Sequence, residues 1–269
     1  MKKTLSIIAS CLAIMAVVSC GNRNGKKTQT SEPVEKTSAQ IQTEQIIKMQ
    51  LDSLANKLSQ VDPIGVIGSV KEGKIELTEK EKQVKPGYLV PTNIANDLQT
   101  LSQKYRAIAV LAVDTEIAKM YDMPVKEYNA ALTKLYADVN DPALKTFSEE
   151  LDIKESIDRY YTASKESNRE YLFWEVMTAS LTEQIYIVSQ NTEKFITAFT
   201  DKSASDVTYD IVLLTIALED LANLDPTYAS LNETIAPLKK INAIDVNQLR
   251  SQLESIKDEI AVSHANLLK

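Results

Sequence analysis

Few residues in this chain have side chains suited to catalytic or covalent chemistry. Two cysteines, Cys11 and Cys20, lie near the N-terminus, and the single histidine, His264, lies close to the C-terminus. A histidine-based triad would have to use His264, and its only hydroxyl or carboxyl neighbour within a turn, Ser263, is adjacent and points elsewhere. We expect His264 to be a solvated side chain near a helix end, and the sequence predicts no catalytic residue.

Metal chemistry also finds little support in the sequence. Zinc usually takes cysteine and histidine ligands, which are scarce here. A di-iron bundle requires Glu-x-x-His, and Ala261 occupies the glutamate position. Asp138, Asn140 and Asp141 lie close together, but Pro142 follows and the EF-hand spacing is absent, so a capped turn is the better interpretation. The sequence predicts no metal site.

The carboxylates and glycines of the chain do not form an enzyme motif that can be recognised in the sequence. Glu149, Glu150 and Asp152 cluster at a predicted helix start, where the helix dipole favours negative charge. A glycosidase needs only two carboxylates, but nothing in the sequence singles out a pair. Gly65-x-x-Gly68 lacks the Gly-Lys-Ser/Thr that completes a phosphate loop.

The segment before Cys20 is organised as a secretory signal. Lys2 and Lys3 precede an uncharged, mostly apolar stretch that runs from Thr4 to Val18. The positive start, the apolar stretch and a small residue before the cleavage point together predict export from the cytoplasm.

This segment leads into Val17-Val18-Ser19-Cys20, which resembles the lipobox of bacterial lipoproteins. The resemblance implies that residues 1–19 are removed and that Cys20 becomes the first residue. Its thiol would then carry a diacylglycerol and its amine an acyl chain, the only cofactor-like groups expected. Ser19 is small, as the family requires, whereas Val17 stands where the family prefers leucine.

Two alternatives to lipidation remain open. One is ordinary secretion with Cys20 as a bystander, and the other is an uncleaved membrane helix, because the uncharged stretch is near the minimum spanning length. Arg23, Lys26 and Lys27 follow that stretch and do not favour the spanning form. Cleavage would also remove Cys11, leaving one cysteine and no internal disulfide.

The charge of the chain excludes one class of partner. The whole chain carries a formal charge of −7, and loss of two lysines with the signal would make the mature body −9. Nucleic-acid binding needs clustered lysine and arginine, so we expect no nucleic-acid partner. Each of the three basic residues after Cys20 could add about 1 kcal/mol of attraction to acidic headgroups, although a soluble tether with incidental charge fits equally well.

The expected location follows from the anchor. A lipidated Cys20 would hold the protein at a membrane outside the cytoplasm. The acidic helical body and its tether favour a Gram-negative bacterium. The resemblance to lipoproteins implies the outer membrane, because Gly21 follows Cys20 as it does in familiar outer-membrane lipoproteins, and the periplasmic face, because no acidic run of the kind that directs surface export follows Cys20.

The elements that must position any functional residue are predicted to be helices. Residues 20–40 are polar and predict a flexible tether, which would span roughly 25 Å. Residues 41–269 predict an elongated, all-α bundle of about six to eight antiparallel helices. Residues 62–91, which hold four glycines and three prolines, predict an irregular insertion compatible with a small hairpin.

Apolar residues at alternating spacings of three and four form the seams of these helices. One seam extends from Ile153 to Phe199 and predicts either a single long helix or a break near Ser164–Asn168. The last extends from Val246 to Ile260. Aspartates are predicted to cap helices at positions 141, 225 and 245.

Aromatic side chains are the remaining candidates for recognition. Tyr160, Tyr161 and Phe173 are the candidate ligand contacts, and Phe173 lies beside the seam rather than on it. Core packing is the competing explanation for all of them.

Three functions follow, each with its own structural expectation. A non-catalytic interaction or scaffold protein of the envelope, with a protein partner, predicts a filled core. A binding protein for a small ligand or glycan predicts a cavity between helices with converging hydroxyls and carboxylates. A carboxylate-based enzyme, the third alternative, predicts two buried carboxylates facing each other in a cleft.

Overall fold

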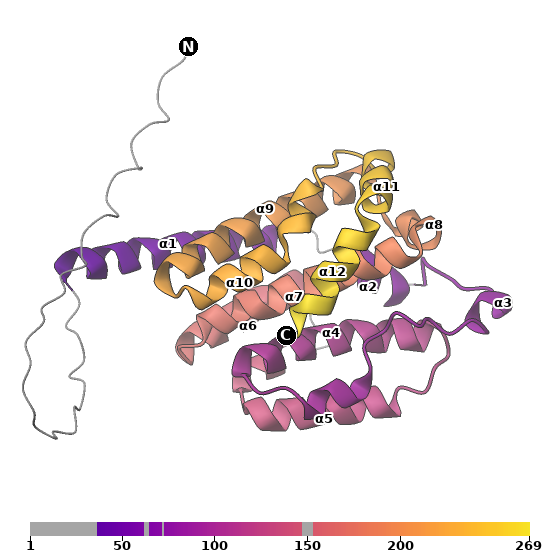
Figure 1. Ribbon diagram of the computed structural model, residues 1–269, viewed down its shortest axis with the longest axis horizontal. Coiled ribbons are helices and arrows are strands. Elements are labelled where there is room, and N and C mark those ends of the chain that lie inside the picture. The colour runs from indigo at the N-terminus through magenta and orange to yellow at the C-terminus, as the bar shows by residue number, and fades with distance from the viewer. Residues whose placement is uncertain (1–36, 62–64, 72, 147–152) are drawn as a thin grey trace, which may run out of the picture. The chain divides into compact units, whose positions relative to one another are not determined.

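The part of the chain that the structure describes is helical (Figure 1). The computed structural model describes residues 37–61, 65–71, 73–146 and 153–269. Within these ranges the chain forms twelve α-helices and four 3₁₀ helices and contains no β-strand, so the predicted all-α fold is confirmed. The predicted signal segment, Cys20 and the carboxylate cluster at 149–152 lie outside the described residues.

The α-helices are between 4 and 24 residues long, so the described chain is divided into more elements than the seams predict. Their bounds are α1 (Ser38–Gln60), α2 (Gly65–Lys71), α3 (Glu79–Lys82), α4 (Leu101–Met120), α5 (Lys126–Val139), α6 (Ile153–Glu166), α7 (Glu170–Gln190), α8 (Thr192–Phe195), α9 (Asp201–Leu224), α10 (Thr227–Thr234), α11 (Val246–Ser255) and α12 (Lys257–Leu267). The 3₁₀ helices are η1 (Thr92–Asn96), η2 (Pro142–Thr146), η3 (Ile196–Ala198) and η4 (Ala236–Lys240). Because α1 begins at Ser38, the last three residues predicted for the tether are helical instead.

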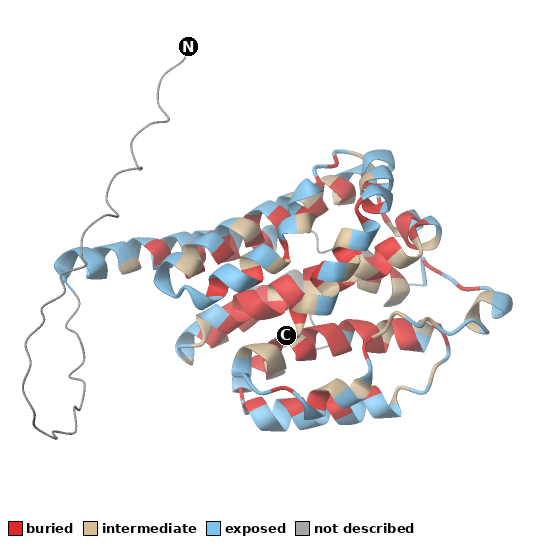
Figure 2. Ribbon diagram, viewed as in Figure 1, coloured by how far each residue is buried: buried red, intermediate tan, exposed pale blue. Residues whose placement is uncertain are grey.

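α7 is the central helix of the bundle. Of its 21 residues, 14 are buried, and Figure 2 shows it enclosed by the surrounding helices. It packs against α4, α6, α9, α11 and α12. A helix that is apolar on nearly all sides is stable only inside a core, which explains the position of α7.

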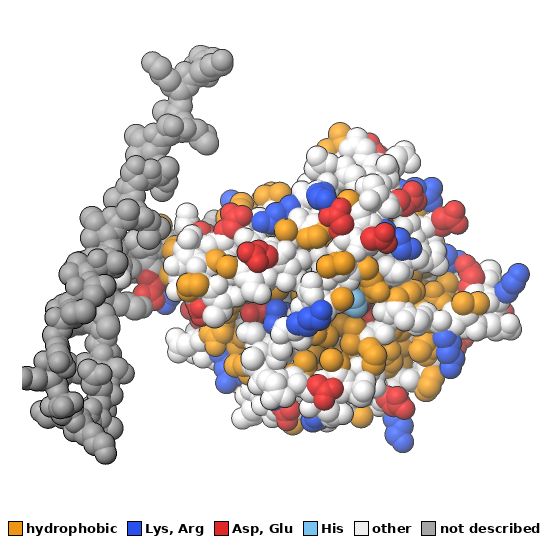
Figure 3. All heavy atoms as spheres, in the orientation of Figure 1, with side chains coloured by type: hydrophobic (Ala, Val, Ile, Leu, Met, Phe, Trp, Pro, Cys, Tyr) orange, Lys and Arg blue, Asp and Glu red, His pale blue; other side chains and the backbone are white. Residues whose placement is uncertain are grey.

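The other helices pack around α7 in pairs. α4 lies along α7 and pairs with α5, while α1 packs against both α6 and α9. α10 folds back on α9, and the residues from Ser38 to Lys269 form one compact unit. On the face seen in Figure 3, hydrophobic side chains gather over the region of α4 and α12.

The seam from Ile153 to Phe199 is interrupted between α6 and α7, as the broken form of that prediction requires. Asn168 adopts a left-handed conformation with φ of 53°, and the amide of Arg169 donates to the carbonyl of Ser164 at 2.7 Å. The hydroxyl of Ser167 also donates to the carbonyl of Ala163 at 3.1 Å. Serines replace the apolar layers here, so side-chain packing does not oppose the turn. The seam is also interrupted at Asn191, where α7 ends before α8, and that second break was not predicted.

Two local predictions were wrong. The hairpin predicted within residues 62–91 is replaced by helical structure, because Gly65–Lys71 form α2. Val66 is fully buried, and Ser69 is buried on the same face of this helix. The seam from Val246 to Ile260 is divided at Ile256, where φ of −113° ends α11 before α12 begins.

The three aspartates predicted to cap helices all bind backbone amides. The amide of Ala143 donates to Oδ1 of Asp141 (2.9 Å), and the amide of Thr227 donates to Oδ1 of Asp225 (2.9 Å). The amide of Gln248 donates to Oδ1 of Asp245 (2.8 Å). Asp245 is the N-cap of α11 and Asp141 directly precedes η2, whereas Asp225 lies one residue before Pro226, which is the N-cap of α10.

Asp141 also joins separate parts of the bundle. Its side chain is fully buried and accepts a hydrogen bond from the hydroxyl of Tyr105 on α4. The guanidinium of Arg169, in the turn before α7, lies 3.6 Å from the same carboxylate oxygen. One buried, fully partnered carboxylate thus holds α4, η2 and the α6–α7 turn together.

Within the described ranges, none of the helices combines the length and the apolar character that a bilayer-spanning segment needs.

Candidate functional site

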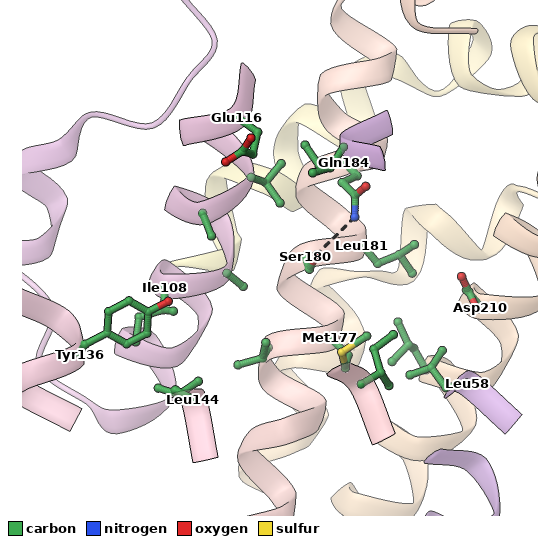
Figure 4. A pocket seen from close by; sticks show the side chains of 17 residues that line it. Leu58, Ile108, Glu116, Tyr136, Leu144, Met177, Ser180, Leu181, Gln184 and Asp210 are labelled. Atoms are coloured by element: carbon green, nitrogen blue, oxygen red, sulfur yellow. Dashed lines mark hydrogen bonds between the residues drawn. The ribbon is translucent and has the colours of Figure 1, made fainter. Parts of the chain in front are cut away.

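A cavity of about 300 Å³ lies between the helices of the bundle (Figure 4). Aliphatic side chains from α1, α2, α4, α6, α7 and α9 make up most of its wall. The residues that line it are Leu58, Ile67, Ile108, Ala109, Ala112, Val113, Glu116, Tyr136, Leu144, Ile157, Val176, Met177, Ser180, Leu181, Gln184, Asp210 and Leu214. A mainly apolar wall with a few polar groups is typical of a site for a small organic ligand.

Three of the lining side chains, those of Glu116, Gln184 and Asp210, carry a carboxyl or amide oxygen. Glu116 on α4 already accepts a hydrogen bond from Lys119 at 2.8 Å. Gln184 on α7 donates through Nε2 to the hydroxyl of Ser180 at 3.3 Å, but its buried Oε1 has no hydrogen-bond partner among the described residues. In the view of Figure 4, Gln184 lies between Glu116 on one side and Asp210 on the other.

Asp210 on α9 is the most unusual group of the wall. It is only 6 % exposed, and its Oδ1 has no hydrogen-bond partner among the described residues. Burial, followed by the nearby charge of Asp206, raises the pKa of Asp210 to about 8. A buried carboxyl that no cation neutralises is costly when ionised, so burial favours the neutral form of Asp210 at pH 7.

The three predicted ligand contacts lie in the core next to one another. Tyr160 and Phe173 are fully buried, and Tyr161 is 9 % exposed. The ring centroid of Phe173 lies 5.6 Å from that of Tyr160, 4.9 Å from that of Tyr161 and 5.0 Å from that of Trp174. These distances and tilted orientations are those of packed aromatic cores, and none of the three residues lines the cavity described above.

Tyr161 does border a second cavity of about 530 Å³, which lies beside α1, α6 and α9. Its polar groups bind one another: the hydroxyl of Tyr161 and the ammonium of Lys165 both donate to Asp52 Oδ1 at 2.7 Å. Burial tends to raise the pKa of Asp52, but these two bonds outweigh it and lower that pKa. Because Asp52 is already bound by two donors, whereas Asp210 of the 300 Å³ cavity has no cationic partner among the described residues, this larger cavity makes the weaker candidate.

His264 is not the solvated side chain that the sequence predicted. Its side chain is 13 % exposed, its ring stacks on Tyr186 with centroids 3.8 Å apart, and its Nε2 lies 2.7 Å from Glu183 Oε2. No partner for His264 could be predicted from its neighbours in the chain, because Glu183 belongs to α7, far away in the sequence. Tertiary packing of α12 on α7 creates the pair.

A second carboxyl completes this cluster. Asp114 on α4 is fully buried, interacts with Glu183 and accepts a hydrogen bond at Oδ2 from the amide of Val90 at 2.8 Å. Burial is the main cause that raises the pKa of Asp114 to about 9 and that of Glu183 to about 8. Burial also lowers the pKa of His264 to about 4, against the opposing charge of Asp114.

The cluster of Asp114, Glu183 and His264 therefore favours protonated carboxyls and a neutral imidazole at pH 7. It brings together two buried carboxyls, as the enzyme alternative requires. However, none of the three residues lines either of the two cavities described, so the cluster has no adjoining space for a substrate there. Sequence reasoning missed it, although single acidic residues within the apolar runs of α4 and α7 were a usable signal.

Comparison of the chain with protein-family models, with curated proteins and with solved structures finds no match. Within the described residues, no group of three or more His, Cys, Asp and Glu side chains is arranged to hold a metal ion.

Proposed function

We propose that this protein is a lipid-anchored protein of the cell envelope that binds a small apolar ligand between its helices. The cavity lined by α4, α7 and α9 carries the proposal. Its volume of about 300 Å³ is at the lower end of the range for ligand sites, which begins near 300 Å³. Its wall is aliphatic with few polar groups, so a ligand would gain mainly from leaving water.

The cavity favours ligand binding over a purely structural role. A scaffold is expected to have a filled core, because protein interiors pack as densely as organic crystals. The space opens to solvent beside exposed wall residues such as Ala112 and Tyr136, so a ligand can enter it, and binding would remove apolar wall from water. The hydroxyl of Ser180 and the carboxyls of Glu116 and Asp210 supply the polar groups that a binding site requires.

The anchor part of the proposal rests on the lipobox-like segment before Cys20. Two or three acyl chains on one residue hold a protein stably at a membrane, whereas one chain does not. The binding unit would then remain close to the outer membrane, on its periplasmic face, where it could take up or deliver an apolar molecule.

Metabolic labelling with an alkyne analogue of palmitate tests the anchor. The wild-type chain is expected to incorporate the label and to fractionate with membranes, because the thiol and amine of Cys20 carry the acyl groups. Cys20→Ala should lose both properties, whereas Cys11→Ala, in the part predicted to be removed, should keep them. Label retained by Cys20→Ala would refute the anchor.

Titration with N-phenyl-1-naphthylamine, a neutral apolar dye, tests the cavity. We expect the segment Ser38–Lys269, which forms one compact unit, to bind one dye molecule with an increase in fluorescence. Ala112 is an exposed residue of the cavity wall, so Ala112→Trp should fill the space without disrupting the core and weaken binding at least tenfold.

Ala130 provides the matched control, since it is an exposed alanine on α5 that does not line the cavity. Ala130→Trp should leave dye binding unchanged. If Ala112→Trp binds the dye as tightly as the wild type, the dye lies elsewhere and the proposed site is wrong.

A further inference from the structure

The polar groups around the 300 Å³ cavity are unbalanced in charge. Two of them are carboxyls, from Glu116 and Asp210, and among the described residues that line the cavity none is lysine, arginine or histidine. A ligand with a carboxylate or phosphate head would therefore find no counter-charge in this wall and would face two acids. The wall disfavours anionic amphiphiles.

The acceptors of the wall are also incompletely used. Oδ1 of Asp210 and Oε1 of Gln184 are both buried without a hydrogen-bond partner among the described residues. Burying an acceptor without a partner typically costs about 1–3 kcal/mol for each group. These two atoms themselves have almost no accessible surface, so a ligand in the cavity would meet Asp210, on α9, through the rest of its carboxyl group.

From this geometry we infer that the cavity selects apolar molecules that carry a cationic ammonium head, with Asp210 as its counter-charge. The inference rests on the proposed ligand-binding function and specifies its ligand class. An ammonium group offers up to three donors and one positive charge in a compact volume, which suits a buried carboxyl that has no cationic partner among the described residues. The aliphatic wall formed by residues such as Leu58, Met177 and Leu181 would hold the apolar chain (Figure 4).

Binding of an ammonium is coupled to a proton of Asp210. Burial favours the neutral acid of Asp210. The other titratable groups of the wall are Glu116 and Tyr136, and Asp206 lies one turn away on α9. The bound cation stabilises the carboxylate, so the acid proton of Asp210 leaves to solvent as the ammonium enters. A neutral alcohol would leave that proton in place.

Isothermal titration calorimetry of Ser38–Lys269 with octylamine, 1-octanol and octanoate at pH 7 tests the selectivity. The three probes share an eight-carbon chain and differ in head charge. We expect octylamine to bind with a Kd at least tenfold lower than either of the others. Titration in two buffers of different ionisation enthalpy should show proton release for octylamine alone.

Two substitutions on α9 assign the selectivity to one carboxyl. Asp210→Asn should remove the preference for octylamine while keeping the affinity for octanol, because the amide fills the same space without charge. Asp206→Asn, whose carboxylate instead accepts from Lys202 at 2.7 Å, should keep the preference. If Asp210→Asn does not fold, the proton release of the wild type decides: octylamine binding without proton release overturns the assignment to Asp210.

The outcomes separate this inference from the function on which it depends. Octanol or octanoate binding as tightly as octylamine, or a preference that survives Asp210→Asn, overturns the ammonium assignment and leaves a ligand-binding cavity. Failure of every probe, together with failure of the neutral dye, overturns both.

Discussion

Replacement of Phe173 by alanine is expected to lower the free energy of unfolding by about 3–5 kcal/mol. The phenyl ring is fully buried, and it contacts the rings of Tyr160, Tyr161 and Trp174. Truncation removes the buried apolar surface of the ring and leaves a cavity that rigid neighbours cannot fill. Because small proteins have a total stability of about 5–15 kcal/mol, this single change would use up a large part of it.

Tyr171 supplies the matched control for this substitution. It lies two residues earlier on α7, is 37 % exposed, and contacts Tyr228 with ring centroids 6.4 Å apart. Tyr171→Ala should therefore change stability by only about 1 kcal/mol or less. Phe173→Leu, which keeps most of the side-chain volume, should fall between the two variants.

Urea denaturation followed by far-ultraviolet circular dichroism measures all three changes without relying on the neighbouring tryptophan. The same series separates the two interpretations of Phe173, as a residue of the packed core and as a ligand contact. If Phe173→Ala were as stable as the wild type but lost affinity for a ligand, the residue would be a ligand contact and its role in the core would be minor.

The positions of the long helices followed from local sequence. Tyr105 and Ile108 in α4, and Leu181, Ile185 and Val188 in α7, recur at spacings of three and four, and all of them are buried. A seam of this kind can be recognised in one dimension because each helix presents it to its neighbours along its full length. The break after α6 was also visible, since serines replace the apolar residues there.

The division between α11 and α12 had no such signal. Leu253, Ile256 and Ile260 keep the helical spacing across the bend, and all three are buried. The bend changes the direction of the chain without changing which residues face the core. Periodicity therefore predicts burial correctly here and cannot reveal that one helix has become two.

The candidate site was less accessible to sequence reasoning than the fold. Asp210 stands between Tyr209 and Ile211 with no motif around it, and its importance depends on what the other helices place opposite it. A cavity is what remains unfilled after side chains from several helices have packed, so no local pattern encodes it. The partner of His264 was hidden for the same reason, because it lies on a different helix.

A second large effect is expected in the pH dependence of stability, and it depends on the cluster of Asp114, Glu183 and His264. The folded protein raises the pKa of Asp114 from 3.8 to about 9 and that of Glu183 from 4.5 to about 8, mainly by burial. At pH values between the unfolded and the folded pKa of each carboxyl, the folded state retains a proton that the unfolded chain has released. The stability linked to these carboxyls is therefore present at low pH and is lost as the pH rises toward 8–9.

His264 contributes with the opposite sign. Burial lowers its pKa from 6.5 to about 4, so the neutral imidazole stabilises the fold above pH 6.5 and this contribution is lost as the pH falls toward 4. The window from pH 6.5 to 8 therefore isolates the carboxyls from the histidine. Asp210, whose pKa is raised to about 8, acts in the same direction as Asp114.

Each proton retained only by the folded state lowers the free energy of unfolding by about 1.4 kcal/mol per pH unit, or about 2 kcal/mol across this window. Urea denaturation at pH 6.5 and at pH 8, followed by the fluorescence of the buried Trp174, measures the change. We expect the wild type to be less stable at pH 8 by at least this amount.

Asp114→Asn tests the origin of that loss. An asparagine amide can donate to Glu183 and accept from the amide of Val90, as the protonated aspartate does, but it has no proton to lose. This variant should therefore lose about 2 kcal/mol less than the wild type between the two pH values. Asp97→Asn removes an exposed carboxyl in place of a buried one and should leave the wild-type slope unchanged. Equal slopes for Asp114→Asn and the wild type would mean that Asp114 is ionised within the folded core and that its partners, rather than a proton, stabilise it there.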